Sequence, residues 1–240
     1  MSGRVGSITT EIITDGLVFN MDAANRASYI NNTAKETIDL VSGSISGTTF
    51  DTTDGIKSLT FDGIDDYINF GDILEQANDG TDKVTLSIWV KWTGTSTYII
   101  FGKCQNASPY NGYTIQARES GKISFGLGTV NNWRYRKTNS SSFNDGTWKN
   151  VIATYNGNRE VSGINIYING SLVLMDSQLD VGTITNVVNI GDCNIGVRGN
   201  SSNRQFYFPG NLANAMQYNR ELSSAEVLHN YNALAGRFGL

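Results

Sequence analysis

The sequence predicts an all-β domain in which two antiparallel sheets pack face to face, with one short helix near the C-terminus. Short segments of alternating apolar and polar residues recur along most of the 240 residues, a period typical of half-buried strands. Glycine is abundant (26 residues) and proline is rare (2 residues), as expected for many strands joined by tight turns. Only one segment carries clear helix signals, so the strands have to pack against one another.

The N-terminal part begins with a polar stretch that contains Ile8, Ile12 and Ile13. We interpret residues 1–15 as an arm and residues 16–240 as one domain. The first strand is expected at 17–22, followed by a turn-rich excursion over 23–32, and a strand pair is expected at 58–61 and 67–70. In the next strand, 84–92, one face is formed by Val84, Leu86, Ile88 and Val90, and Trp89 lies on the other face. Trp89 therefore lies either between the sheets or under a covering segment.

The middle of the chain predicts four further strands, at 98–103, 113–118, 122–127 and 133–137, with a hairpin-like turn at 119–121. Two more strands, at 148–155 and 163–168, precede Asn169-Gly170. This dipeptide is the strongest hairpin signal in the chain, because a type I′ turn needs positive φ at both central residues. Segments 187–191, 205–208 and 212–218 are expected to complete the sheets.

A single helix is expected after Ser223. Ser223 and Glu226 form a capping box, Ser at the N-cap and Glu at N3. An apolar stripe follows, and Gly236 stands where a C-terminal cap belongs. The stripe consists of Val227, Leu228, Tyr231 and Leu234. A helix this short is marginal alone, so we expect the sandwich to cover the stripe.

Charge and cysteine content exclude several function classes. The chain has 18 basic and 22 acidic residues and a net charge of −4, without the basic clusters that nucleic-acid binding needs. Cys104 and Cys193 are the only cysteines, and without Cys-x-x-Cys spacing or histidine partners they do not predict a zinc site. Two free thiols or one disulfide are both compatible with the sequence.

Five segments in a fixed order carry a family resemblance. Together they resemble the laminin-G-like, or concanavalin-A-like, jelly roll over residues 16–235, namely 58–68, 84–91, 148–155, 166–170 and 218–223. The resemblance implies a two-sheet sandwich that binds, adheres or assembles, and only some members of this group catalyse. Several members hold calcium, but Val41–Gly47 contains no Asn or Asp, and Ala213-Asn214 stand where two acidic residues are common. We therefore predict no metal, and we interpret the acidic turn at Asp62–Asp66 as structural.

Catalysis is not predicted, and neither is a cofactor. His229 is the only histidine and lies on the outer side of the expected helix, so a Ser-His or Cys-His nucleophile has no other base. Hydrolases that resemble this fold carry Glu-x-Asp-x-Glu on one strand, and no such run occurs here. A carboxylate pair assembled by folding is the remaining route to hydrolysis.

Aromatic residues in expected loops, together with one arginine, are the candidate glycan contacts. These are Tyr110, Tyr113, Trp133, Arg134 and Tyr135. In the strand at 133–137, Trp133 and Tyr135 share one side while Arg134 and Arg136 share the other. Rings can stack on sugar faces and guanidinium groups can donate to hydroxyls, although core packing explains Trp133 and Tyr135 equally well.

The two ends of the chain are similar to those of tailed-phage virion proteins with this fold, at 14–18, 22–25, 28–29 and 230–240. The resemblance implies a non-enzymatic virion structural protein that decorates the head or forms a fibre or tail-appendage subunit. We expect the arm with Ile8, Ile12 and Ile13 to bind other virion proteins, and the protein to form a homo-oligomer on the particle. The N-terminus lacks the apolar core of a signal peptide, so we expect synthesis in the host cytoplasm and no membrane insertion. The alternative is an adhesion module that recognises host-surface polysaccharide.

Overall fold

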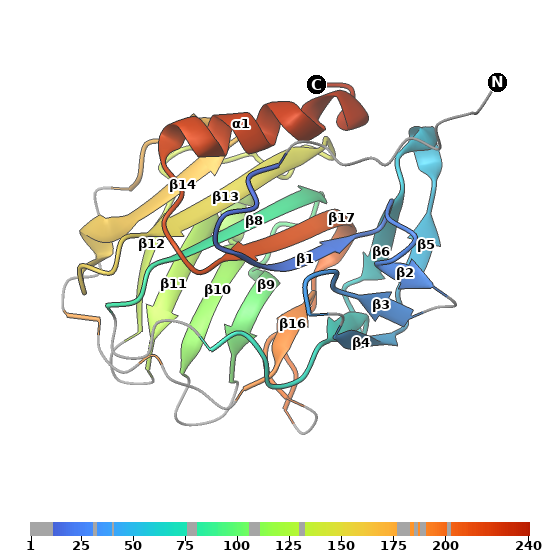
Figure 1. Cartoon of the computed structure of the whole chain (residues 1–240), viewed down its shortest axis with the longest axis horizontal. Helices are drawn as coiled ribbons and strands as arrows, with labels where there is room; N and C mark the ends of the chain where they lie inside the picture. The colour runs from blue at the N-terminus through green and yellow to red at the C-terminus, as the bar shows by residue number, and fades with distance from the viewer. Residues whose placement is uncertain are drawn as a thin grey trace.

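The structure is a computed structural model that describes residues 12–30, 33–39, 41–75, 81–105, 111–129, 133–176, 183–184, 187, 191–200 and 203–240. Two antiparallel sheets face each other, and the helix α1 (Ser224–Ala235) lies along the outer face of one of them (Figure 1). This architecture confirms the predicted fold class.

The first sheet has eight strands among the described residues. In spatial order these are β15 (Ser171–Leu172), β14 (Ile164–Ile168), β13 (Lys149–Tyr155), β8 (Val84–Lys91), β17 (Pro209–Tyr218), β6 (Ser58–Asp62) and β5 (Thr49–Asp51), with β1 (Leu17–Asp22) also paired to β17. The sheet therefore joins the beginning of the domain to its end through the β1–β17 pair.

The second sheet has nine strands among the described residues. In spatial order these are β12 (Arg134–Lys137), β11 (Ile123–Gly128), β10 (Gly112–Ala117), β9 (Tyr98–Cys104), β16 (Cys193–Ile195), β7 (Tyr67–Asn69), β4 (Ser42–Ser46), β3 (Thr33–Lys35) and β2 (Tyr29–Ile30). Strands β12 and β2 are the two edge strands of this sheet.

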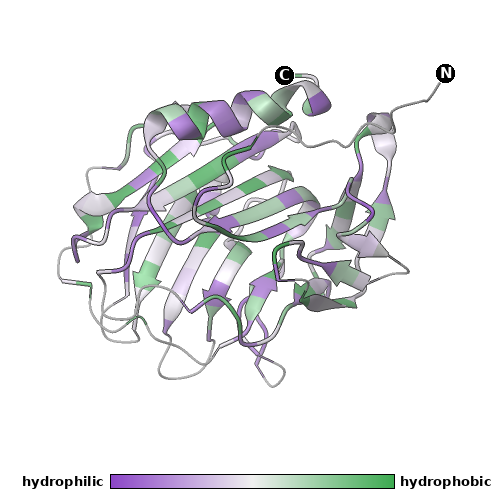
Figure 2. Cartoon of the chain, viewed as in Figure 1, coloured by the Kyte–Doolittle hydropathy of each residue, from purple (hydrophilic) through white to green (hydrophobic). Residues whose placement is uncertain are grey.

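The main hydrophobic core lies between the two sheets and follows from the period of two. In β8, Val84, Leu86, Ile88 and Val90 all belong to this core, as the alternation predicts. Along several strands green segments alternate with white or purple ones, which is the same pattern seen as hydropathy (Figure 2). Tight turns close the hairpins where they were expected. Asn169 and Gly170 both have positive φ (50° and 74°), and Ser120 and Gly121 do as well (62° and 70°).

A second core lies between the first sheet and the helix. Trp89 belongs to it and is completely buried, because Phe238 stacks on its indole with ring centroids 3.9 Å apart. Phe238 belongs to the single turn of 3-10 helix, Gly236–Phe238, that continues α1. Trp89 is thus covered by the C-terminal segment rather than placed between the sheets.

The helix begins as predicted and differs in its buried face. The Ser223 side chain accepts from the Glu226 backbone N–H, and the Glu226 side chain accepts from the Ser223 N–H. Asn230 is buried in the face where only apolar residues were expected, and Leu228 is exposed. Gly236 has right-handed φ, and the left-handed residue after the helix is Gly239 (φ 72°).

Three strand predictions differ from the structure. Residues 29–51 were not expected to contain the short strands β2 to β5, because their polar sequences lack a strong alternation. Residues 205–208 form only an isolated bridge at Gln205, paired with Arg198. The strand expected at 187–191 is replaced by β16 at 193–195, and residues 188–190 lie outside the described residues.

The described part of the N-terminal arm packs on its own domain. Ile12 and Ile13 contact the second core, the Ile13 N–H donates to Asn230 Oδ1 (2.8 Å), and the Tyr218 hydroxyl donates to the Ile13 carbonyl (2.9 Å). The boundary between arm and domain at residue 15 stays a prediction, although Ile12 and Ile13 before it lie against the domain. Ile8 lies outside the described residues. No helix in the described part of the chain is long and apolar enough to span a membrane.

Candidate functional site

The edge strand β12 turns two aromatic rings away from the core. Its register pairs Tyr135 with Gly126 and Arg134 with Leu127, so Tyr135 shares the outer side of the sheet with Gly126. Trp133 lies on the same side, because its indole Nε1 is the atom nearest to where a Cβ on Gly126 would stand. The predicted pairing of Trp133 with Tyr135 on one side of the strand is confirmed. We call Trp133, Tyr135, Gly126, Arg118 and Arg198 the outer platform.

The two arginines on β12 have the opposite orientation. Arg134 and Arg136 pair with Leu127 and Phe125, both of which face the core between the sheets. Arg136 donates to the Ile164 carbonyl on the first sheet (2.8 Å), and burial lowers the pKa of its guanidinium. The side chain of Arg134, a predicted glycan contact, therefore lies on the opposite side of β12 from the Trp133 and Tyr135 rings.

A small residue allows the rings to lie close to the sheet. A Cβ on Gly126 would stand 2.7 Å from Trp133 Nε1 and 3.0 Å from the Tyr135 Cβ, distances that leave no room for a methyl group. Gly126 pairs with Thr114 on β10, whose hydroxyl accepts from Gln116 Nε2 (2.8 Å). Behind the rings the outer side of the sheet is thus made of glycine and short polar side chains.

Two arginines from other segments approach the rings. The guanidinium carbon of Arg118 lies 5.2 Å from the centre of the Tyr135 ring, and that of Arg198 lies 5.7 Å from the centre of the Trp133 ring. Arg118 also donates to Gln116 Oε1 (3.0 Å), and Arg198 donates to the Gln105 carbonyl (3.3 Å). Neighbouring polar groups therefore hold both guanidinium groups over the rings.

The other predicted glycan contacts do not join the platform. Tyr113 is wrong as a contact because its side chain has no exposed surface. It points into the core, where its hydroxyl donates to the Leu74 carbonyl (2.8 Å) and accepts from Gln217 Nε2 (2.9 Å), and burial raises its pKa. Tyr110 lies outside the described residues.

Three members of the platform were not predicted from the sequence. Gly126 carries a weak signal, since a glycine inside a strand often marks a close approach by another group. Arg118 and Arg198 carry none, because they are 17 and 63 residues from Tyr135 and only the fold brings them together.

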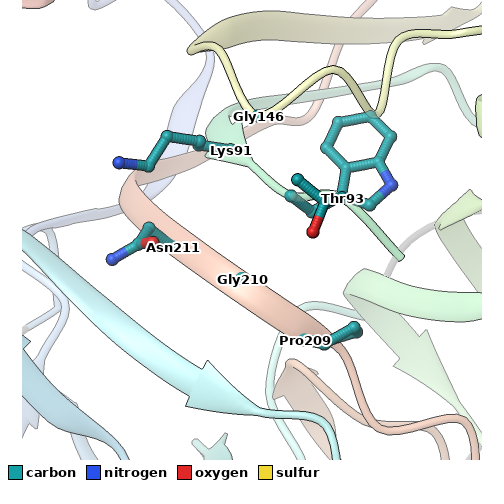
Figure 3. A pocket seen from close by; sticks show the side chains of 7 residues that line it. Lys91, Thr93, Gly146, Pro209, Gly210 and Asn211 are labelled. Atoms are coloured by element: carbon teal, nitrogen blue, oxygen red, sulfur yellow. The ribbon is translucent and has the colours of Figure 1, made fainter.

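Three of the pockets that indent the described surface are lined by no platform residue. One, of about 320 Å³, lies where β8 ends and β17 begins and is lined by Lys91, Trp92, Thr93, Gly146 and residues 209–211. Figure 3 shows Lys91 and Asn211 extending toward the same side of it. The Asn211 amide already donates to Thr60 Oγ1 (2.8 Å) and Asp51 Oδ2 (3.1 Å), so it is bound within the domain. This pocket offers Lys91 as its one charged group and lacks the paired rings of the platform.

The acidic turn and the cysteines have structural explanations. Asp62, Asp65 and Asp66 bring their carboxylates within 4.8 Å of one another. Asp62 accepts from the Ile64 and Asp65 N–H groups, and Asp66 accepts from the Asp62 N–H, so these carboxylates stabilise their own turn. Cys104 and Cys193 are free and buried, and burial raises their thiol pKa values to about 11 and about 12.

The buried side chain of Lys103 binds a segment at the surface of the domain. Lys103 is 1% exposed and pairs with the half-exposed carboxylates of Asp72 and Glu75, the latter at 2.6 Å. Its ammonium also donates to the Ile73 carbonyl (2.9 Å). These contacts hold segment 72–75 against the sandwich, which is a structural role.

Comparisons with known proteins agree with this fold. A model of the concanavalin A-like lectin/glucanases superfamily matches residues 61–228. No curated protein matches the chain. Domain 4 of AbnA, an extracellular arabinanase of Geobacillus stearothermophilus solved with arabinotriose, superposes with a TM-score of 0.62 at 15% identity, and the match covers 90% of this chain and 98% of that domain.

Two longer proteins contain the same fold. The receptor-binding domain of botulinum neurotoxin C/D mosaic serotype has a TM-score of 0.62 at 15% identity, over 92% of this chain and 52% of that one. Trypanosoma rangeli sialidase, solved with sialic acid, has a TM-score of 0.62 at 14% identity, over 94% of this chain and 34% of that one. This chain spans about half of the toxin domain and a third of the sialidase, and likeness at such identity shows the fold alone. The family match over most of the chain shows that it belongs to the concanavalin A-like lectin/glucanase superfamily.

Proposed function

We propose that this protein is a non-enzymatic carbohydrate-binding domain whose site is the outer platform. The observation that carries the proposal is the pair of half-buried rings, Trp133 and Tyr135, held side by side on the outer face of the second sheet. The rings are flat apolar groups, and the guanidinium groups of Arg118 and Arg198, which lie over them, offer hydrogen-bond donors. An apolar face edged by donors is the chemistry that a sugar ring with its hydroxyls requires.

The structural neighbours support this ligand class by analogy. Domain 4 of AbnA matches this chain over nearly its whole length and was solved with arabinotriose. Fold likeness does not transfer a ligand, so the proposal depends on the platform residues themselves.

A glycan array followed by calorimetry tests the proposal. The intact protein is expected to bind at least one polysaccharide above background, and Trp133→Ala and Tyr135→Ala are each expected to weaken that binding at least tenfold. The matched control is Phe50→Ala, which removes an exposed ring stacked on Tyr29 at the other end of the sandwich, and it should leave binding unchanged. No binding on the array, with or without calcium, would refute the proposal.

We expect binding without hydrolysis. Two carboxylates lie close to the platform, those of Glu119 and Asp176, and both take part in ion pairs with Lys137 (3.7 and 3.9 Å). A glycosidase needs two carboxyl groups that flank the scissile bond. Incubation with the bound polysaccharide should release no new reducing ends, and release that Glu119→Gln abolishes would instead identify a hydrolase.

The virion role remains a second proposal, based on the two ends of the chain. Those ends lie together in the fold. Arg220 pairs with Asp15 (2.9 Å), and Arg237 forms a bidentate pair with Asp22 (2.8 Å for both bonds). The N-terminal and C-terminal motifs therefore contact each other and stabilise the fold, whatever particle or partner the protein serves.

Electron microscopy of the source material, with antibody labelling, tests the virion role. Label on a capsid or tail would support it, and a protein found only free of particles would refute it. Because Ile12 and Ile13 already pack on the domain, docking on other virion proteins would fall to residues before Ile12, including Ile8.

A further inference from the structure

Strand β12 concentrates positive charge in an acidic protein. Three of its four residues, Arg134, Arg136 and Lys137, are cations, whereas the whole chain has a net charge of −4. Charged residues on an edge strand also discourage pairing with other chains, so β12 alone does not identify a ligand.

The cations that come from outside β12 carry the argument. Arg118 follows β10 and Arg198 follows β16, yet both place their guanidinium groups beside the β12 rings. Protection of an edge does not require arginines from two other segments. Their positions over Tyr135 and Trp133 instead link the positive charge to the proposed stacking surface.

Charged groups cluster around the two rings of the outer platform. Four cations gather there, Arg118, Lys122, Lys137 and Arg198, against the two acids Glu119 and Asp176. The two acids share the three cations near Tyr135 at distances of 3.4 to 3.9 Å. The described residues around the platform therefore include more cations than acids, whereas the whole chain has more acidic than basic residues.

We infer that the glycan bound by the outer platform is anionic, carrying carboxylate or sulfate groups. The inference rests on the proposed function and names its ligand class. A sugar ring against Trp133 or Tyr135 would place an acidic substituent within reach of Arg198 or Arg118. Guanidinium is planar and binds carboxylate or sulfate oxygens through paired N–H donors, which sugar hydroxyls do not match as well.

Matched polymer pairs test the charge preference separately from glycan binding. One pair is polygalacturonate and its fully methyl-esterified form, which share a backbone and differ in charge. The other is dextran sulfate and dextran. By calorimetry at low salt, the charged member of at least one pair should bind at least tenfold tighter, and the advantage should shrink in about 0.5 M salt as screening shortens to a few ångströms. The pair that shows the preference identifies the acidic group.

Variants separate stacking from charge. Arg118→Gln and Arg198→Gln should each remove most of the preference for the charged polymer, because binding of that polymer should weaken more than binding of its neutral partner, with unchanged melting temperature. Trp133→Ala should weaken both members of the pair. Arg26→Gln, an exposed charge near β2 at the opposite end of the second sheet, is the control and should change neither.

Each outcome has one meaning. Equal binding of charged and neutral members in both pairs would overturn the inference and leave the proposed function intact. A preference that survives in both Arg118→Gln and Arg198→Gln would also overturn it. Absence of binding to every polymer on the array, charged or neutral, would refute the proposed function itself.

Discussion

Gly126 decides whether the Trp133 ring can lie close to the second sheet. A Cβ at this position would stand 2.7 Å from the indole Nε1, so Gly126→Ala should push the ring away and lower glycan affinity about tenfold, or about 1.4 kcal/mol. The backbone at Gly126 does not need positive φ, so alanine is allowed there and the domain should still fold. Calorimetry with the best polymer from the array measures the effect.

The control for this substitution is Gly236→Ala. Nothing lies within 4 Å of a Cβ at Gly236, and its backbone is already helical (φ −59°). Alanine should leave binding unchanged and stabilise the domain slightly, by about 0.5 kcal/mol. Equal affinity of the Gly126→Ala and Gly236→Ala proteins would show that the Trp133 position is not determined by the glycine.

Glu226 makes part of the stability depend on pH. Hydrogen bonds from the Arg220 guanidinium (2.6 and 3.1 Å) are the main cause that lowers the pKa of Glu226 to about 2, and the Ser223 N–H adds to the effect. The folded pKa lies below the unfolded value of about 4.3, so this stabilisation is present above pH 4.3 and is lost as the pH falls toward 2.

Urea unfolding at about pH 5 and about pH 3 tests this linkage. Between these values the native protein should lose about 1 kcal/mol more stability than Glu226→Gln, a figure reduced because solvent screens a partly exposed pair. If both proteins lose the same stability on acidification, the Arg220–Glu226 pair does not contribute to the pH dependence.

At the scale of the element, α1 is attached by a buried amide as well as by its cap. Asn230 is 1% exposed, accepts from the Ile13 N–H and donates to the Tyr218 hydroxyl (3.0 Å). Asn230→Ala should lower the free energy of unfolding by about 2–3 kcal/mol, because it leaves the Ile13 N–H without its acceptor and removes the hydrogen bond to the Tyr218 hydroxyl. Ser223→Ala should lower it by about 1 kcal/mol through the lost N-cap.

Chemical denaturation of these variants beside His229→Ala checks the order. His229 is exposed on the helix, so its replacement should change neither stability nor glycan binding. A larger loss for Ser223→Ala than for Asn230→Ala would mean that helix formation, rather than docking of the helix, limits stability here.

At the scale of the whole molecule, the two outer faces of the sandwich have different roles. The first sheet is covered by α1, the 3-10 turn with Phe238, and the segment around Ile12 and Ile13. The second sheet carries the platform. We therefore expect substitutions under α1 to lower the stability with little effect on glycan affinity. Substitutions of the outward-facing residues of β12 should lower glycan affinity with little effect on stability.

Replacing Ile12 and Ile13 together by serine tests this division. Both side chains are half-buried against the second core, so the double variant should lose roughly 1–2 kcal/mol of stability while glycan affinity at 20 °C stays within about twofold. Thermal melting and calorimetry measure the two quantities. Unchanged melting would indicate that this segment does not stay packed on the domain in solution.

Local patterns in the sequence were sufficient for many of the strands, for two hairpin turns and for the helix start. The faces of 84–91, the Asn169-Gly170 turn and the Ser223–Glu226 box depend on residues close in the chain, whose geometry is set by local backbone preferences. The sides of Trp133 and Tyr135 followed from the same period of two. These features could be predicted because each involves only a few adjacent residues.

What only the tertiary structure decided is which segments meet. The burial of Tyr113, the cover of Trp89 by Phe238, the Asn230 amide under the N-terminal segment, and the approach of Arg118 and Arg198 to the β12 rings all join distant residues. Alternation tells which side of a strand a residue faces, but not whether that side meets another sheet, a helix or solvent. What a strand face meets depends on how whole sheets pack. The sequence alone therefore determined the two-sheet sandwich and the shared side of Trp133 and Tyr135, whereas the tertiary structure determined that Arg118 and Arg198 lie over these rings.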